Sequence, residues 1–413
     1  MTDTAPTPPD RRSLRAAYVI GLFGMGYIDI FVFLMPLYGL SLGLNAAEIG
    51  WLVGSRTILT LFFSIHIGVL MDRFGTLSVM RFFVIIAMLA APLYPLLDSF
   101  WALLLLQMIV GGAVSFGWAG GQTLIAQIGH GDARYIGYFS FASRLGTTGA
   151  PLIAGAVWDF GGAWPAYLLA VIWGVILLVT LWFATEPPIE KGQQATEHPS
   201  GAREKLSLRD IMPRVSDYTH SFAMMVIPVI AISVAVMFLR NTTSGINNSV
   251  YVVYLDGIGL TGWDIGILFA AIEFASGIGS LFGGPAMRLG HPLWTMTIAT
   301  GLAIALISIT PWLGGLFVLL LAAQVLRGFV QGVSQPVMFS AQSKSVGRHE
   351  QGAVVGLRQT LNRLSAIIVP PVMGAIADHW GIGESFIIMG FGLLFLCLMV
   401  AVWVALAPRE PIE

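Results

Sequence analysis

Charged residues are scarce in this chain. Of its 413 residues only 10% are Asp, Glu, Lys or Arg, whereas 56% are hydrophobic, and the mean hydropathy is +0.81. A soluble globular domain carries about 25% charged residues, and a single buried core stops growing near about 250–300 residues. One very large soluble core is therefore a poor explanation. The composition predicts an integral membrane protein whose partner is the lipid bilayer.

Other absences exclude further classes of protein. The lone cysteine, Cys397, cannot form a disulfide framework within the chain, and the seven histidines show no metal-ligand spacing. A net charge of −1 gives no reason to expect nucleic acid. None of the three lysines follows a glycine, so the sequence contains no P-loop of an ATPase. We expect no cofactor, no metal and no enzymatic activity, because no group of histidines and acids gathers near one membrane face.

Twelve apolar runs are long enough to cross a bilayer as helices. Polar, proline-rich residues 1–13 precede the first run, which has no short hydrophobic core followed by a cleavage site, so we expect a retained anchor. The runs lie near residues 15–40, 47–71, 77–97, 100–128, 134–158, 163–185, 219–254, 263–285, 292–311, 314–342, 350–376 and 382–407.

A hydrophilic stretch rich in Pro, Gly, Gln and Glu separates the sixth run from the seventh, and we expect a flexible linker there. The predicted fold class is an all-α integral membrane protein with twelve transmembrane helices in two six-helix bundles, working as a monomer. The predicted divisions are a tail 1–14, a first bundle 15–185, the linker 186–216, a second bundle 217–407 and a tail 408–413.

Lys and Arg fall on one side of the predicted spans. The odd-numbered loops contain none, whereas the even-numbered loops, the linker and both tails hold many. Cytoplasmic loops carry such an excess of basic residues. The bias predicts that both termini and the linker lie in the cytoplasm. We expect the membrane to be a bacterial inner membrane.

The two halves of the chain resemble each other. Residues 37–50 align without gaps on residues 253–266, so that Glu48 matches Asp264. Farther on, Arg144 and Asp159 match Arg363 and Asp378 at one constant offset, together with shared glycines and a proline. Two six-helix halves in the same orientation form a parallel repeat, which places a substrate site near the membrane midplane between them.

The loop "GVLMDRFG", residues 68–75, interrupts two apolar runs with charge. Gly68 and Gly75 permit close approach and a tight turn. Asp72 can accept from a helix N-terminus or pair with an Arg, and Arg73 can bridge to the end of another helix. A simple polar turn with a cytoplasmic Arg is the alternative. The second copy, "GGPAMRLG", has Met in place of the Asp but retains Arg288 and Gly290.

Twelve spans in two repeats, a central linker and this Gly-x-x-x-Asp-Arg-x-Gly loop resemble the major facilitator superfamily of secondary transporters, over nearly the whole chain. The resemblance implies transport of a small molecule by alternating access. It also implies that the loop latches the cytoplasmic ends of the two halves. Because only one copy has the acid, we expect an asymmetric latch in which Asp72 stabilises the outward-facing state.

A second motif lies in the fifth span. The run "GYFSFASRLGTTGAPLIAG" resembles the glycine-rich run ending in Gly-Pro of the drug-efflux branches, which implies proton-coupled export. Ala150 replaces the glycine before the proline, Arg144 replaces a small residue, and Gln107 stands where those branches have a buried arginine. A standard drug-pump mechanism therefore does not carry over whole. The matching residues are Gly146, Gly149, Pro151 and Gly155, with Pro370 and Gly374 at the repeat positions.

Two acids inside predicted spans are candidates for proton coupling. A carboxylate whose charged partner changes during alternating access can load and release a proton. Asp29, in "MGYIDIFVF", is the first candidate, with a fixed salt bridge as the alternative. Glu273 is the second, and in the repeat alignment it falls one residue from the counterpart of Arg56. That placement suggests an Arg56–Glu273 pair across the cavity, or a bipolar site for a zwitterion.

Six arginines lie inside predicted spans, where each charge costs roughly 2.5–3.5 kcal/mol on insertion scales. Arg144 and Arg363 occupy equivalent positions, so they suggest an anion clamp across the cavity, or supports within each half. Arg358 is interpreted as structural. Arg240 begins a polar run typical of a broken cavity helix. The substrate-binding candidates are Arg56, Arg144, Arg240, Arg363, Asn241, Asn247 and Asn248.

These observations predict a proton-coupled exporter of a small anionic or zwitterionic organic solute. Import of an organic anion remains the alternative, because alternating access runs in either direction with the gradients. A membrane-embedded sensor or enzyme on the same scaffold is a distant alternative, since the linker is too short and polar to form a folded sensory domain.

Overall fold

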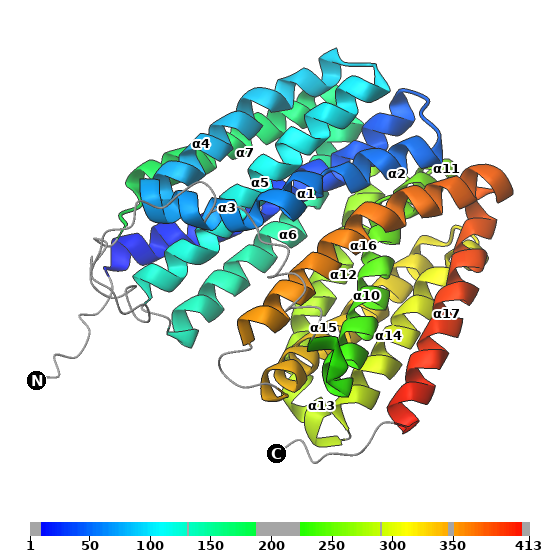
Figure 1. Cartoon of the computed structure of the whole chain (residues 1–413). Helices are drawn as coiled ribbons and strands as arrows, with labels where there is room; N and C mark the ends of the chain where they lie inside the picture. Colours follow the sequence, from blue (N-terminus) through cyan, green and yellow to red (C-terminus); the bar gives the residue numbers. More distant parts are fainter. Residues whose placement is uncertain (1–9, 130–131, 187–223, 290, 346–350, 407–413) are drawn as a thin grey trace, which may run out of the picture.

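The structure is a computed structural model that describes residues 10–129, 132–186, 224–289, 291–345 and 351–406. All of the regular elements within these ranges are helices, and they form two bundles (Figure 1). Apart from Glu186, the predicted linker lies outside the described residues.

The first bundle contains the helices from α1 to α7, coloured blue to green in Figure 1. Its long helices pack around α1, whose buried face supplies much of the first bundle's core. The elements are α1 (Arg11–Ser41), α2 (Ala46–Ser55), α3 (Ile58–Phe74), α4 (Thr76–Ala90), η1 (Ala91–Leu96), α5 (Phe100–Ile128), α6 (Ala133–Gly161) and α7 (Ala163–Phe183).

The second bundle runs from the short η2 to α17, coloured green to red in Figure 1. Its elements are η2 (Met224–Val226), α10 (Pro228–Asn247), α11 (Val250–Gly257), α12 (Gly262–Leu281), α13 (Gly283–Leu289), α14 (Pro292–Ser308), η3 (Thr310–Leu313), α15 (Phe317–Lys344), α16 (Gln351–Trp380) and α17 (Ile382–Leu406).

Ten segments of the described chain are long and apolar enough to cross a membrane. The remaining two predicted spans correspond to α14, with 17 residues, and to α6, with 29 residues. The twelve predicted spans therefore all correspond to helices. The first helix begins at Arg11, four residues before the predicted start, because the Asp10 carboxylate accepts hydrogen bonds from the backbone N–H groups of Arg12 at 3.2 Å and Ser13 at 3.1 Å.

Two spans are broken. The seventh span divides where α10 ends at Asn247 and α11 begins at Val250, which confirms the predicted break. The second span divides between α2 and α3 at Arg56 and Thr57, which the sequence analysis did not predict. The Thr57 hydroxyl donates to the carbonyl of Gly54 at 3.1 Å, a back-bond that bends helices.

The bundles meet at the end of the molecule opposite the described ends of the chain. We call this end the distal face and the other end the terminal face. In Figure 1 the bundles converge near α2, α11 and α16 and diverge toward the terminal face. Glycines allow the convergence, since Gly50 of α2 lies against the carbonyl of Pro370, and its repeat counterpart Gly266 lies against the carbonyl of Pro151.

Two aspartates join the bundles at the distal face. Asp378, near the end of α16, accepts hydrogen bonds from the first two backbone N–H groups of α2, both at 2.9 Å. Asp159, near the end of α6, accepts from the first two N–H groups of α12, both at 2.7 Å. Each carboxylate thus satisfies two donors that a helix N-terminus leaves unpaired. We call these two contacts the distal latches.

Capping boxes complete the same two helix starts. In α2, Asn45 and Glu48 exchange side-chain to backbone hydrogen bonds at 2.8 and 2.9 Å. In α12, Thr261 and Asp264 do the same, both at 3.2 Å. The capping boxes use the N-cap and third N–H groups, so the distal latches supply the two remaining acceptors.

Candidate functional site

A central cavity of about 90 Å³ lies between the two bundles. It combines two carboxylates, one guanidinium group and several amides and hydroxyls with an apolar wall. Both bundles contribute, through α1, α6, α10, α12 and α15. The lining residues are Asp29, Val32, Thr147, Pro151, Ser244, Asn247, Asn248, Phe269, Ile272, Glu273, Arg327 and Gln331.

Asp29 lies on α1 and faces this cavity. One of its carboxylate oxygens, Oδ2, is buried and has no hydrogen-bond partner within the described structure. Thr147 of α6 lies beside it, and Arg56 is the basic group within electrostatic range. The described residues contain no salt bridge to Asp29, so the predicted alternative of a fixed pair is not what this state shows.

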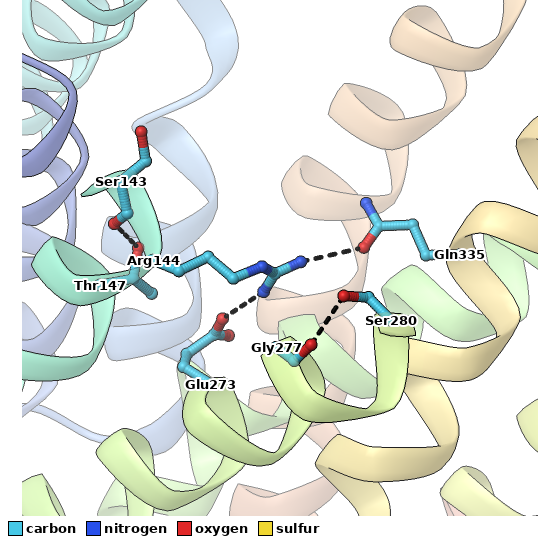
Figure 2. Close-up of polar contacts among 7 residues, drawn as sticks. All are labelled: Ser143, Arg144, Thr147, Glu273, Gly277, Ser280 and Gln335. Atoms are coloured by element: carbon cyan, nitrogen blue, oxygen red, sulfur yellow. Dashed lines mark hydrogen bonds and ion pairs between the residues drawn. The ribbon is translucent and has the colours of Figure 1, made fainter. Parts of the chain in front are cut away.

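Glu273 of α12 pairs with Arg144 of α6 across the bundle interface (Figure 2). The Nη1–Oε2 distance is 3.5 Å, and Nη2 donates to Gln335 Oε1 of α15 at 3.4 Å. About a third of each charged side chain is exposed, at 34% for Arg144 and 37% for Glu273. The predicted pairing of Arg56 with Glu273 is therefore wrong for this state, because Arg144 extends past Gly277 to reach the same carboxylate.

The other candidate arginines lie around the cavity without lining it. Arg56 sits at the break between α2 and α3, with its backbone pressed against Gly111 and its Nε buried without a partner in the described residues. Arg240 lies on α10 within electrostatic range of Glu273. Arg363 of α16 is half-buried and lies within electrostatic range of Arg56. Its proposed clamp with Arg144 stays a prediction.

Two of the three candidate asparagines reach the cavity. Asn247 and Asn248, at the break of the seventh span, both line it. Asn241 instead donates to Asn362 of α16 and ties two helices of the second bundle together. Arg358 is also accounted for within that bundle, since its guanidinium lies 4.2 Å from the ring centroid of Phe339.

Neither Arg327 nor Gln331 of α15 was predicted as part of the site. Both are almost fully buried and both line the cavity, at 2% and 6% exposed. Arg327 donates through Nη2 to the side-chain oxygen of Asn247, and Gln331 donates to the hydroxyl of Thr243 at 2.8 Å. Their spacing of four residues on one apolar span was the available signal, because it places both on one helix face.

The motif of the fifth span serves close packing. A Cβ at Gly146 would overlap the carbonyl oxygen of Leu22 on α1, whereas Gly149 faces open space. Pro151 lines the cavity. Toward the distal face, Gly155 presses against the carbonyl of Gly262. The repeat residue Gly374 makes the equivalent contact with Ala46, and Pro370 contacts Gly50 as described above.

The Gly68–Gly75 loop lies at the terminal face. Gly75 has φ +87° and ends α3, which confirms the predicted tight turn, but Gly68 meets open space and makes no close approach in this state. The nearby start of α4 is capped by Glu186, whose carboxylate accepts from the backbone N–H of Thr76 at 2.7 Å. Arg73 is exposed and lies over the ring of its neighbour Phe74, 5.3 Å from the centroid, and it makes no bridge to another helix among the described residues.

The other candidates for the cytoplasmic gate are Asp72, Arg288 and Gly290. The side chain of Asp72 and the whole of Gly290 lie outside what the structure describes, and Arg288, on α13, is exposed. The predicted latch by Asp72 therefore stays a prediction. The inter-bundle latches that the structure does contain lie at the opposite face.

A sequence model of the Major Facilitator Superfamily matches residues 16–239 and 230–413. The multidrug resistance protein MdtG of Salmonella typhimurium (strain LT2) is 27% identical over 157 residues, which cover 36% of this chain and 37% of MdtG. MdtG of Salmonella newport matches to the same extent. The aligned part thus spans little more than a third of these curated relatives.

Solved structures of transporters have the same fold. A variant of the nucleoside transporter NupG aligns with a TM-score of 0.79 at 14% identity, covering 94% of this chain and 99% of NupG. A bacterial homologue of the human lysosomal transporter Spinster, inward-facing and unoccupied, aligns with a TM-score of 0.71 at 16% identity over 95% of each chain. With a family model covering almost all of its length, this chain belongs to the Major Facilitator Superfamily and is a membrane transporter.

Proposed function

We propose that this transporter exports a small organic anion or zwitterion in exchange for protons, by alternating access. We further propose that it lies in a bacterial inner membrane with both termini in the cytoplasm. The local similarity to the multidrug resistance protein MdtG supports export. The one-sided Lys and Arg pattern supports the orientation. In that orientation the distal face, where the two latches lie, is periplasmic, and the terminal face is cytoplasmic.

The observation that carries the proposal is Asp29. It is an acid in the interior of a membrane-spanning helix, it faces the central cavity, and one of its oxygens has no partner in the described structure. Ionisable residues at such positions are costly and usually mark proton or substrate pathways. A carboxylate with a fixed guanidinium partner would stay ionised throughout the cycle, whereas Asp29 has Arg56 only within electrostatic range.

The Arg144–Glu273 pair offers a means of coupling. It joins α6 of one bundle to α12 of the other, and its N–O distance of 3.5 Å is long for a strong ion pair. An anionic group that binds Arg144, or a proton that binds Glu273, would compete with this pair and so weaken a link between the bundles. Occupancy of the cavity would thereby change the relative stability of the two access states.

Proton flux in proteoliposomes tests the proposal. Vesicles loaded with a pH-sensitive dye receive the full-length protein and are challenged with succinate or phosphonoacetate. We expect these anions to drive proton movement opposite to their own, and Asp29→Asn to abolish that movement while gradient-free exchange of the anion continues. Asp256→Asn, which removes an exposed acid near the distal face, is the matched control.

The sign of the dye response distinguishes the directions of coupling. Proton movement in the same direction as the anion would mean symport, and would replace export with proton-coupled import. Full coupling in Asp29→Asn would remove Asp29 from the mechanism. Anion accumulation that is unchanged after the proton gradient is collapsed would refute proton coupling altogether.

A further inference from the structure

Arg327 is the most deeply buried charged side chain of the central cavity. It is 2% exposed, and its Nε has no hydrogen-bond partner within the described structure. The only ion pair among the described residues joins Arg144 and Glu273, so Arg327 has no carboxylate of its own. A buried and unpaired guanidinium is costly, and it persists where it serves a ligand or a path.

The neighbours of Arg327 hold it in place without neutralising it. The side-chain oxygen of Asn247 accepts from Arg327 Nη2 and also from Gln324 Nε2, at 3.0 Å in the second case. The guanidinium carbon lies 5.9 Å from the ring centroid of Tyr251. These contacts come from neutral groups that are themselves at least nine-tenths buried. They fix the position of the guanidinium but carry no negative charge to neutralise it.

The repeat shows that Arg327 is not a packing residue common to both halves. Gly111 lies against the backbone of Arg56, and Gly328 lies against the backbone of Ile272. Arg56 and Ile272 are counterparts in the repeat alignment, so the two glycines occupy equivalent crossings. Arg327 therefore corresponds to Val110, which is fully buried in the first bundle. Packing at this crossing requires only an apolar residue.

The surrounding charges are also unbalanced. Glu273 lies within electrostatic range of Arg144, Arg240 and Arg327, and Asp29 lies within range of Arg56. Four guanidinium groups thus face two carboxylates, an excess of two positive charges. A bound anion would reduce this excess, whereas a cation would increase the repulsion.

We propose that Arg327, held by Asn247, recognises the oxyanion head group of the transported solute, either a carboxylate or a phosphonate. This rests on the proposed function and adds the group that decides its substrate class. The planar guanidinium can present two N–H donors to two oxygens of such a head group. The cavity of about 90 Å³ is smaller than the pockets of about 300–1,000 Å³ that hold drug-sized ligands, so we expect it to take the head group of the solute.

Thermal unfolding of the purified full-length protein tests this role, because a ligand that binds the folded state raises its Tm. The probes are succinate and phosphonoacetate, with succinamide as the neutral control and choline as the cationic one. We expect the two anions to stabilise the wild type, and the Kd to rise at least tenfold in Arg327→Gln. Arg358→Gln, which removes a guanidinium outside the cavity, should bind the anions as the wild type does.

A second variant guards against misfolding of the first. Asn247→Asp keeps the shape of the side chain but places a carboxylate on Arg327. We expect it to fold, and to bind both anions at least tenfold more weakly. Wild-type affinity in Asn247→Asp or in folded Arg327→Gln would overturn the assignment of Arg327.

The outcome also separates this assignment from the proposed function. Anions that stabilise the wild type and both variants equally would refute Arg327 alone and leave anion transport standing. Stabilisation by choline and not by the anions would refute the anionic substrate class together with Arg327. Phosphonoacetate carries both a carboxylate and a phosphonate, so a larger Tm rise with phosphonoacetate than with succinate would identify the phosphonate as the preferred head group.

Discussion

The distal latches give the sharpest prediction about how this transporter moves. When the distal face opens, Asp159 and Asp378 separate from the helix N-termini that they cap. Four backbone N–H groups then donate hydrogen bonds to water instead. Hydrogen bonds to charged groups contribute about 1.5–3 kcal/mol, and a carboxylate at a helix N-terminus gains about 0.3–1 kcal/mol from the helix dipole. Two of the four hydrogen bonds are exposed to solvent, so the lower end of each range applies.

Asparagine keeps one acceptor oxygen but brings an NH₂ group toward the helix N-terminus. We therefore expect each Asp→Asn change to cost the closed distal face about 1.4 kcal/mol, which is a tenfold shift in the equilibrium. The two latches join different helix pairs: Asp378 of α16 caps α2, and Asp159 of α6 caps α12. Their effects should add, so that the double variant shifts the equilibrium about a hundredfold toward the distal-open state.

Distances between spin labels at Ser41 and Ile258 measure this equilibrium, since both residues are exposed at the distal face and lie in different bundles. Cys397→Ser removes the native thiol, which is buried and contacts the carbonyl of Thr297. We expect the long-distance population to grow in the order wild type, single variants, double variant. Asp256→Asn should leave it unchanged, and a wild-type distribution in the double variant would refute the latch argument.

Three further predictions follow from single contacts. Gly146→Ala should lower the free energy of unfolding by about 1–3 kcal/mol, because the added methyl group overpacks the contact with α1. Gly149 faces open space, so Gly149→Ala should leave the free energy of unfolding unchanged or raise it by about 0.5–1 kcal/mol. Thermal unfolding measures both effects. Glu273→Gln removes a negative charge beside Arg144, so succinate should bind several-fold more tightly; weaker binding would mean that Glu273 holds a cationic group of the solute. Arg358→Ala should cost about 1 kcal/mol of stability, read from the Tm, and leave anion-driven flux intact.

Much of the architecture follows from the sequence, because a bilayer leaves few ways to satisfy backbone hydrogen bonds. Apolar runs of sufficient length located all twelve spans, and the polar run after Arg240 located the break in the seventh. The break in the second span was not predicted, because the hydroxyl residues at this break are not specific to broken helices. The hydroxyls of Ser55 and Thr57 bond back to the carbonyls of the preceding turn, and such bonds also occur in unbroken helices.

The sequence predicted some members of the site but not their pairings, and it missed Arg327 and Gln331. Asp29, Glu273 and Asn247 could be selected from the sequence because a polar group inside a membrane span is costly to bury. All three line the cavity. Which arginine meets Glu273 depends on the rotation of α6 and α12 about their axes, and an alignment of repeats does not fix that rotation. Arg144 reaches Glu273 by extending along Gly277, a contact between bundles that no local pattern encodes.

The latch residues were visible as repeat matches before their contacts were known. Asp159 aligns with Asp378, and Glu48 aligns with Asp264, yet nothing in the alignment says that each aspartate caps a helix of the opposite half. The contacts join residues more than 100 positions apart. Sequence similarity between the halves identified the residues, and only the arrangement of the bundles gives them a role.

Symmetry separates the two tasks of the molecule. Three kinds of contact at the distal face occur in both halves: the distal latches, the capping boxes, and the contacts of Gly50 and Gly266. Such repetition is expected where two equivalent helix pairs open and close together. The cavity breaks this symmetry, because Arg327 stands where the first half has Val110. A solute is not symmetric, so a site that recognises its head group must differ between the halves, whereas a gate gains from being the same in both. Changes to Asp159 and Asp378 should therefore resemble each other in their effect on motion, and changes to Arg327 should alter binding without a counterpart in the first bundle.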